Sequence, residues 1–178
     1  MWTRLTNVCP TLALIVAACM PAAHSVAQDF SLHEADADNL ATGHFAWDPQ
    51  LAPSGPMHMV VNLGEQRAFV YRDDVLIGIS TISSGKPGHQ TPTGTFTVLE
   101  KRKFHRSNEY DDAPMPYMQR LTWKGLAMHA GHVADHPDSH GCVRLPRRFA
   151  QALFKATSVG MQVTITDQEP DEETSTAS

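Results

Sequence analysis

Residues 129–144 read His129-Ala-Gly-His-Val-Ala-Asp-His-Pro-Asp-Ser-His-Gly-Cys142-Val-Arg144, so one short stretch holds four histidines and a cysteine. A thiol of ordinary pKa is only about 3% thiolate at neutral pH, so a nucleophilic cysteine needs a neighbouring base or positive charge. His129, His140 and Arg144 are candidates for both roles. Gly141 lets the backbone come close to a substrate and direct N–H groups at a developing oxyanion. This composition indicates a thiol active site.

The hexapeptide Ser139-His-Gly-Cys-Val-Arg144, with His129 upstream and Thr91-Pro-Thr-Gly94 earlier, resembles the signature of the L,D-transpeptidase catalytic domain, the YkuD-type family. The resemblance covers roughly residues 57–166. It implies a mainly β fold, a β-sandwich catalytic domain with one short helix after the active-site cysteine. It also implies that Cys142 attacks an acyl carbonyl to form a thioester, while His129 acts as base and then as acid.

The residues around the cysteine take supporting roles in this comparison. Gly141 and Cys142 are expected to contribute backbone N–H groups to an oxyanion hole, and His140 to shape the turn and that hole. Ser139 is expected to hydrogen-bond within the turn. Arg144 either keeps the surroundings of the thiolate positive or binds a substrate carboxylate, and a structural salt bridge is its alternative role.

The group that orients His129 is the open question of this site. In the family the acceptor is commonly supplied by the residues just after the histidine, often through a backbone carbonyl. This chain has Ala130 and Gly131 there, and Ala130 departs from the Ser or Gly often found at that place. Ala130 has only its backbone to offer, so we expect Ala130 and Gly131 to shape the turn and leave the third partner unassigned.

Two further histidines of the stretch, His132 and His136, have no place in the family pattern. With His129, Asp135 and Cys142 they could form a zinc site, because His and Cys are zinc ligands. Their spacing matches no motif such as His-Glu-x-x-His, and a metal on Cys142 would quench the nucleophile. We therefore expect no metal, and the implied chemistry needs no cofactor.

The first 27 residues predict export. They contain Arg4 in a polar start, an apolar core at residues 12–18 and a small-residue ending at Ala27, a pattern typical of a secretory signal peptide. The expected location is the periplasm. The apolar core is too short to span a bilayer, and no later segment approaches the ~20 apolar residues needed, so we expect no transmembrane segment. Alternatively, Val16-Ala-Ala-Cys19 resembles a bacterial lipobox, and acylation of Cys19 would tether the protein to a membrane.

Length and composition allow one domain. The chain has 178 residues, 42% hydrophobic and 19% charged, which is enough for a single core. The formal net charge of −5 becomes more negative when Arg4 leaves with the leader, which argues against nucleic acid as a partner. Cleavage after Ala27 would also remove Cys9 and Cys19, so Cys142 would then have no cysteine with which to form an intrachain disulfide.

The first half of the domain predicts strands. Residues 28–56 are interrupted by Pro and Gly and predict a linker or an N-terminal arm, with Phe45 and Trp47 available to hold it in place. Three alternating or apolar runs then predict an antiparallel meander; they are residues 57–63, 66–72 and 75–82. The turn-rich residues 83–94 predict a loop that leads into the alternating residues 95–103.

The polar, Pro-rich residues 104–116 predict a flap over the substrate cleft, because loops of this length in compact domains are commonly functional. Met115 and Tyr117 are then expected to contact the substrate, and packing at the rim of the cleft is their alternative role.

The rest of the chain predicts two more strands, a helix and a final strand. The first strands are expected at 117–123 and, short and buried, at 125–129. A helix is expected after Pro146, with Phe149 and Leu153 in the core, and a last strand at 161–166. Residues 167–178 predict a disordered acidic tail.

These expectations describe a periplasmic L,D-transpeptidase that acts on peptidoglycan stem peptides. By the resemblance, the carbonyl of the donor's third, diamino residue acylates Cys142 with loss of D-Ala, and the acyl group passes to an amine of another stem, forming a 3-3 cross-link. Another amine, such as that of an acceptor lipoprotein, is an alternative acceptor. The alternatives are an L,D-carboxypeptidase or a wall-protein-releasing hydrolase with the same thioester and, from another class, a non-catalytic wall-binding protein. The resemblance also implies acylation of Cys142 by carbapenems.

Overall fold

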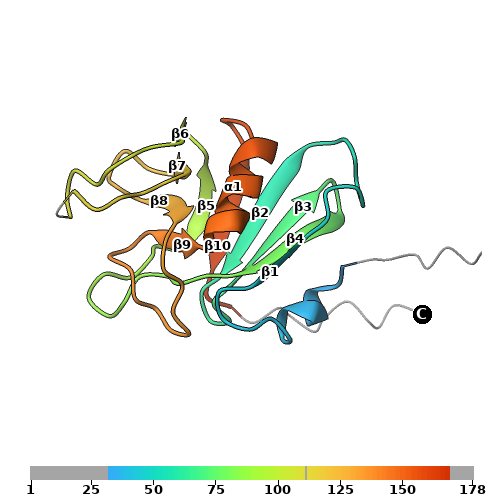
Figure 1. The fold of residues 1–178 in the computed structure, drawn as a ribbon, viewed down its shortest axis with the longest axis horizontal. Coiled ribbons are helices and arrows are strands. Elements are labelled where there is room, and N and C mark those ends of the chain that lie inside the picture. Colours follow the sequence, from blue (N-terminus) through green and yellow to red (C-terminus); the bar gives the residue numbers. More distant parts are fainter. Residues whose placement is uncertain (1–31, 111, 169–178) are drawn as a thin grey trace, which may run out of the picture. The chain divides into compact units, whose positions relative to one another are not determined.

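The computed structural model describes residues 32–110 and 112–168. The leader expected at residues 1–27, including the lipobox cysteine Cys19, lies outside these residues, as does nearly all of the tail expected at 167–178. Within the described residues the protein is mainly β, with two sheets and one α-helix that follows Cys142 (Figure 1). The predicted fold class is therefore confirmed.

The larger sheet has six strands in the order β1-β4-β3-β2-β10-β5. Their bounds are β1 Phe45–Trp47, β2 Met57–Asn62, β3 Arg67–Arg72, β4 Val75–Thr81, β5 Gly94–Thr97 and β10 Gln162–Thr166. Strands β2, β3 and β4 form the antiparallel meander that the sequence predicts. Strand β10 lies parallel to β2 and antiparallel to β5, so it joins two parts of the sheet that are distant in the sequence.

The smaller sheet has four strands in the order β6-β7-β8-β9. Their bounds are β6 Glu100–Arg102, β7 Met118–Arg120, β8 Ala127–Ala130 and β9 Val143–Leu145. The alternating run at 95–103, which reads as one segment in the sequence, is divided between the two sheets. The division occurs because the Val98 N–H donates to Met161 O, beside β10, whereas the Leu99 N–H donates to Arg120 O in β7.

The helix α1, Arg147–Ala156, lies between the two sheets in Figure 1. It begins after Pro146, which suits a helix start because its fixed φ and missing N–H cost nothing there. Phe149 and Leu153 are fully buried in the main core with residues from both sheets, as the helical spacing predicts. Among residues 32–110 and 112–168, none of the helices could span a lipid bilayer.

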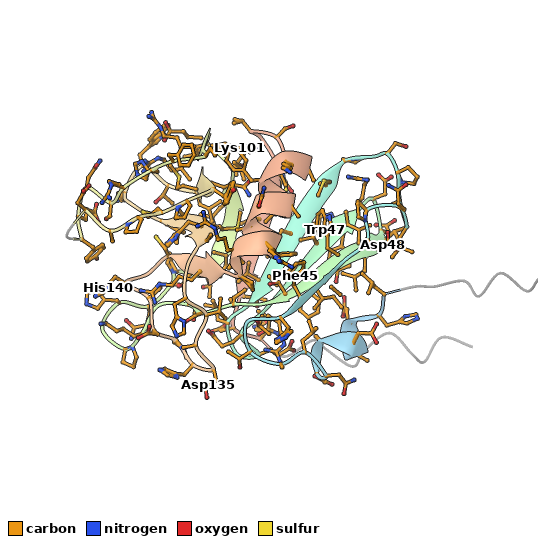
Figure 2. All side chains as sticks on the ribbon, viewed as in Figure 1. Phe45, Trp47, Asp48, Lys101, Asp135 and His140 are labelled. Atoms are coloured by element: carbon orange, nitrogen blue, oxygen red, sulfur yellow. The ribbon has the colours of Figure 1, made fainter. Side chains whose placement is uncertain are left out.

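The N-terminal arm is partly built into the larger sheet. Residues 32–56 contain a short 3-10 helix, η1 (Glu34–Ala37), and the edge strand β1, which pairs with β4. Phe45 and Trp47 lie beside α1 in Figure 2, and both rings contact the Phe149 ring, at 5.5 and 5.7 Å between centroids. Gly78, opposite Trp47, leaves room for the indole, since a Cβ there would lie 2.5 Å from it. The sheet thus begins before residue 57, where the sequence predicts its start.

Candidate active site

The parallel pair β8 and β9 brings the two candidate catalytic residues together. Met128 is opposite Val143 and His129 is opposite Arg144. Met128 and Val143 are fully buried in the main core. Because side chains alternate along a strand, His129 and Cys142, each next to one of these core residues, project toward the other face of the smaller sheet. Thirteen residues of separation in the sequence are therefore reduced to a diagonal step between neighbouring strands.

His129 and Cys142 both line a cavity of about 820 Å³ above this face of the sheet. Its walls come from the loops between β6 and β7, between β7 and β8 and between β8 and β9, with a contribution from the loop between β4 and β5. Among the residues that line it are Gln90, His105, Glu109, Tyr110, Met115, Arg120, Lys124, Gly125, His132, His140, Gly141, Arg144 and Arg147. A cavity with a thiol, an imidazole and several cations can accept an acyl substrate that carries carboxylates.

His129 is buried, with 8% of its surface exposed. Its Nδ1 lies 2.9 Å from the carbonyl oxygen of Ala130, which places the proton on Nδ1 and leaves Nε2 as the basic atom. Burial lowers the pKa of His129; the Ala130 hydrogen bond opposes this effect, and the charge of Arg144 adds to it. The imidazole is therefore neutral at neutral pH, as a general base must be. The backbone of Ala130 fills the position of the third partner, which the sequence leaves unassigned.

The thiol of Cys142 is half-buried and packs against Met115, Met118 and Ala127. It donates to the carbonyl oxygen of Gly125, with 3.4 Å between sulfur and oxygen. Burial raises the pKa of Cys142, and this outweighs the lowering by the backbone of Ala127 and the charge of Arg144. The resting thiol is therefore protonated at neutral pH, so a nucleophilic reaction at this sulfur would require a base to remove the proton.

The turn before the cysteine is closed by Ser139. The Ser139 hydroxyl donates to Cys142 O at 2.5 Å, and the Gly141 N–H donates to Ser139 Oγ at 3.1 Å. Gly141 has φ +112°, a conformation that favours glycine. The sequence predicts that the Gly141 N–H lies in the oxyanion hole. In the structure this N–H donates to Ser139 Oγ inside the turn. The Cys142 N–H is the other expected donor, and it precedes β9 directly.

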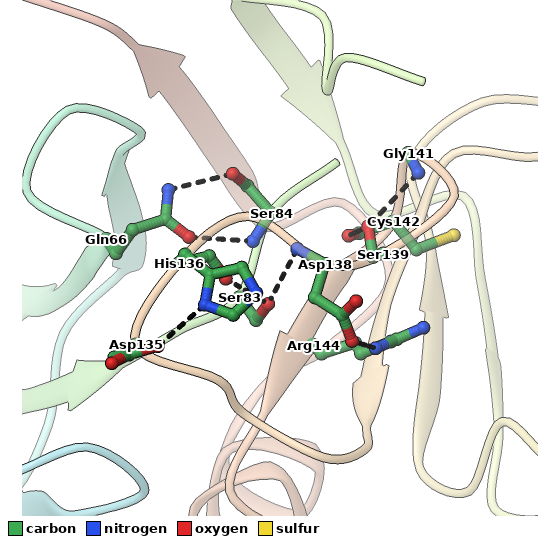
Figure 3. Close-up of polar contacts among 10 residues, drawn as sticks. All are labelled: Gln66, Ser83, Ser84, Asp135, His136, Asp138, Ser139, Gly141, Cys142 and Arg144. Carbon is green, nitrogen blue, oxygen red and sulfur yellow. Dashed lines mark hydrogen bonds and ion pairs between the residues drawn. The ribbon is translucent and has the colours of Figure 1, made fainter. Parts of the chain in front are cut away.

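The loop between β4 and β5 holds the turn in place. Thr91 Oγ1 donates to Gly141 O and accepts from the Gly85 N–H, both at 2.9 Å, so the Thr91-Pro-Thr-Gly94 segment supports the cysteine motif. Ser84 O accepts from the N–H groups of Asp138 and Ser139. Figure 3 shows the same support from the side chains, with Gln66 bound to Ser84 and Ser83 bound to Asp138.

Arg144 projects from β9 and forms an ion pair with Asp138, with 2.9 Å between Nη1 and Oδ2 (Figure 3). Its side chain is 21% exposed and lines the cavity. Gly131 makes room for it, since a Cβ on Gly131 would lie 3.1 Å from Arg144 Cγ and Cδ. Arg144 thus forms the structural salt bridge that was considered as its alternative role. It also lies in the cavity wall, where its charge lowers the pKa of both Cys142 and His129.

His140 lies at the mouth of the cavity, on the loops remote from Phe45 and Trp47 in Figure 2. Its exposed ring stacks on Tyr110, with centroids 4.7 Å apart, and meets His89 edge to face at 5.0 Å. Tyr110 belongs to the loop expected to form a flap, so three separate loops meet here. Sequence reasoning missed Tyr110 and Glu109 as cavity residues. The polar loop that carries them was the available signal, but it does not single them out.

The two residues expected to contact substrate from the flap are separated in the structure. Met115 is buried, lines the cavity and contacts the thiol. Tyr117 is outside the cavity lining; its ring packs against Phe154 of α1 at 5.8 Å, with the Arg147 guanidinium over it at 5.8 Å. Tyr117 has φ +56°, a left-handed conformation that directs it into this packing. Its position corresponds to the packing role considered as the alternative.

His132 and His136 do not come together in one cluster. His132 lines the cavity, whereas the exposed His136 lies 2.6 Å from the carboxylate of Asp135. Among the residues that the structure describes, no three His, Cys, Asp or Glu side chains are arranged to hold a metal ion.

In this two-sheet fold a half-buried thiol and a neutral histidine thus line one cavity. A family model described as the YkuD L,D-transpeptidase catalytic domain matches residues 56–165. The chain belongs to this family.

Individual relatives agree with this assignment. A probable L,D-transpeptidase 3 of Mycobacterium tuberculosis is 29% identical over 104 residues, which is 49% of this chain and 38% of the relative. A solved L,D-transpeptidase of Mycobacterium smegmatis shares the fold, with a TM-score of 0.59, 23% identity, and coverage of 64% of this chain and 59% of that chain. One from Stackebrandtia nassauensis gives a TM-score of 0.59 at 25% identity, covering 67% and 58%. The chain spans less than two thirds of the length of each of these relatives.

Proposed function

We propose that this protein is a cysteine-dependent L,D-transpeptidase that acts on peptidoglycan stem peptides. The observation that carries the proposal is the placement of Cys142 and His129 on one face of the smaller sheet, in the wall of one cavity. Membership of the YkuD family supplies the reaction class. The leader pattern at residues 1–27 adds export to the periplasm as part of the same proposal.

Acylation begins with the protonated thiol. Nε2 of His129 takes the thiol proton as the sulfur attacks the carbonyl carbon of the donor, because Nδ1 is already bound to Ala130 O. The negative charge that develops on the carbonyl oxygen is stabilised by the N–H of Cys142 and by the positive field of Arg144. The carbon–nitrogen bond then breaks, the imidazolium gives its proton to the departing amine, and D-Ala leaves a thioester on Cys142.

Deacylation repeats the sequence with an incoming amine. Nε2 of His129 accepts a proton from the amine as its nitrogen attacks the thioester carbon. The carbon–sulfur bond breaks and the sulfur recovers the proton, which restores the resting enzyme. An amine from a second stem peptide gives a 3-3 cross-link, and water would give the carboxypeptidase product through the same thioester.

The carboxylates of a stem peptide suit the charge of the cavity. Arg120, Lys124, Arg144 and Arg147 all line it. A peptide carboxylate entering such a site gains charge-assisted hydrogen bonds that an uncharged substrate would not make. The same chemistry fits β-lactams. Among the solved relatives are an LD transpeptidase, LdtMt1, in complex with imipenem, and an L,D-transpeptidase 3 from Mycobacterium tuberculosis in complex with a faropenem-derived adduct.

The direct test is to incubate the purified protein with a disaccharide tetrapeptide, alone and with an acceptor peptide, and to separate the products by mass. The proposal expects a cross-linked dimer with release of D-Ala, and an imipenem adduct whose mass is found on the peptide containing Cys142. Cys142→Ser should form neither product nor adduct. D-Ala release without dimers would identify the carboxypeptidase instead, and a wild-type protein that is folded but inert would refute catalysis.

A further inference from the structure

We infer that Glu109 determines specificity for the donor, because its carboxylate binds a primary ammonium that the donor carries near the carbonyl that is attacked. The inference rests on the proposed function, in which the donor acylates Cys142 through a diamino residue. That residue has a side-chain amine, which is protonated at neutral pH and can remain so throughout the reaction. No bond to Glu109 forms or breaks.

The carboxylate of Glu109 lies beside Gly125, the residue whose carbonyl oxygen accepts a hydrogen bond from the Cys142 thiol. A Cβ on Gly125 would lie 3.1 Å from both carboxylate oxygens of Glu109, and Gly125 has φ +99°. The carbonyl of the same glycine accepts from Cys142 Sγ at 3.4 Å. The Glu109 carboxylate and the Cys142 thiol thus both lie beside Gly125, and the negative charge of Glu109 contributes to raising the pKa of Cys142. A group bound by this carboxylate is held close to the reacting carbonyl.

The loop between β6 and β7 holds Glu109 in this position. Ser107 Oγ accepts from the N–H groups of Glu109 at 3.2 Å and Tyr110 at 3.0 Å, which closes the local turn. The Tyr110 ring then stacks on the His140 ring, with 4.7 Å between their centroids. The glutamate is therefore anchored on both sides to groups that belong to the cavity.

The charges in the cavity leave Glu109 available to a cation. Of the described residues that line the cavity, Glu109 is the only acid, among the basic Arg120, Lys124, Arg144 and Arg147. Arg120 and Arg144 pair with acids outside the lining, Glu100 and Asp138. Within the described part of the chain the Glu109 carboxylate is in no ion pair. The basic groups suit the carboxylates of a stem peptide, and the single acid suits its ammonium.

A cycle of two donors and two proteins tests the inference. The donors are a tetrapeptide with a free side-chain amine and the same peptide acetylated on that amine, and the measurement is kcat/KM for D-Ala release. In the wild type, acetylation should lower kcat/KM by about tenfold or more, the effect of one charge-assisted hydrogen bond. Glu109→Gln should lose a similar factor on the free-amine donor and show no further loss on acetylation.

Two controls distinguish recognition from a structural role. Asp74→Asn removes an exposed acid that lies outside the cavity lining, and it should keep the wild-type preference for the free amine. Glu109→Gln should still form the imipenem adduct, which reports a folded site. It should also be alkylated faster than the wild type at a fixed mildly alkaline pH, because removing the charge of Glu109 lowers the pKa of Cys142.

Several results would overturn the inference. A wild type that uses both donors equally, or a Glu109→Gln variant that loses the same factor on both, shows that the carboxylate does not bind the donor amine. A variant that releases D-Ala normally but transfers poorly to the acceptor assigns Glu109 to the acceptor instead. A wild type that releases D-Ala from neither donor, while it still forms the imipenem adduct, refutes the proposed function itself.

Discussion

Thr91 and Gly141 are fifty positions apart in the chain, yet the Thr91 hydroxyl donates to the Gly141 carbonyl at 2.9 Å. The same hydroxyl accepts from the buried Gly85 N–H. One side chain therefore connects the loop after β4 to the turn that presents Cys142, and it satisfies two backbone groups.

Replacing Thr91 with Val should therefore weaken both the fold and the site. The shape is kept, but the Gly85 N–H and the Gly141 carbonyl lose their partner, and each buried group left unpaired costs about 1–3 kcal/mol. We expect a lower free energy of unfolding in urea and slower imipenem acylation. Thr93→Val, at an exposed position of the same segment, is the matched control and should change neither. Equal effects of the two substitutions would show that the contact is unimportant.

Replacing His129 with Gln should remove the base on which a protonated thiol depends. Loss of general-base catalysis lowers rates by about 10²–10⁴-fold, so kcat for D-Ala release should fall by this order. Because burial raises the pKa of Cys142, little thiolate is present to compensate. His136→Gln alters an exposed histidine outside the cavity lining and should retain activity. A fully active His129→Gln enzyme would require another base.

Burial of His129 should also make stability depend on pH. The pKa of His129 is lower in the folded protein than its ordinary 6.5, so below about pH 6.5 the unfolded chain binds a proton that the folded chain does not. The stability contributed by the neutral ring is present above this pH and is lost as the pH falls. Urea unfolding at pH 7.5 and 5.5 should show a larger loss of unfolding free energy in the wild type than in His129→Gln. Identical losses would mean that the ring is accessible to protons.

Replacing Tyr117 with Ala should affect stability and leave donor kinetics unchanged. The ring packs on Phe154 and Arg147 outside the cavity lining, so its removal should cost about 1–3 kcal/mol of unfolding free energy. KM for the donor should stay at the wild-type value. Phe104→Ala, at a ring that is 80% exposed, is the control for loss of an aromatic side chain and should have little effect on stability. A raised donor KM in Tyr117→Ala alone would return this residue to the substrate site.

The sequence predicts the parts of this fold that depend on neighbouring residues. The meander β2-β3-β4 and helix α1 follow from alternation and helical spacing, because the backbone hydrogen bonds of both join residues close in the chain. The division of residues 95–103 between two sheets depends on partners near residues 120 and 161. Local periodicity contains no information about such partners, so the sheet order could not be predicted.

The candidate site shows the same limit. Cys142 and His129 are recognisable from their motif, and the structure places them on one face of a sheet. Glu109 and Tyr110 lie in an irregular polar loop, where nothing in the sequence separates a cavity residue from a solvated one. Their proximity to Gly125 and His140 comes from the tertiary fold alone.

The position of β10 has a consequence for the order in which the chain folds. Gln162–Thr166 fills the place between β2 and β5, so these two strands have no common partner until this segment has been synthesised. A ribosome that has released only the first hundred residues therefore exposes an incomplete sheet with an open edge on β2. The larger sheet is therefore completed only when nearly the whole of the catalytic domain has been made.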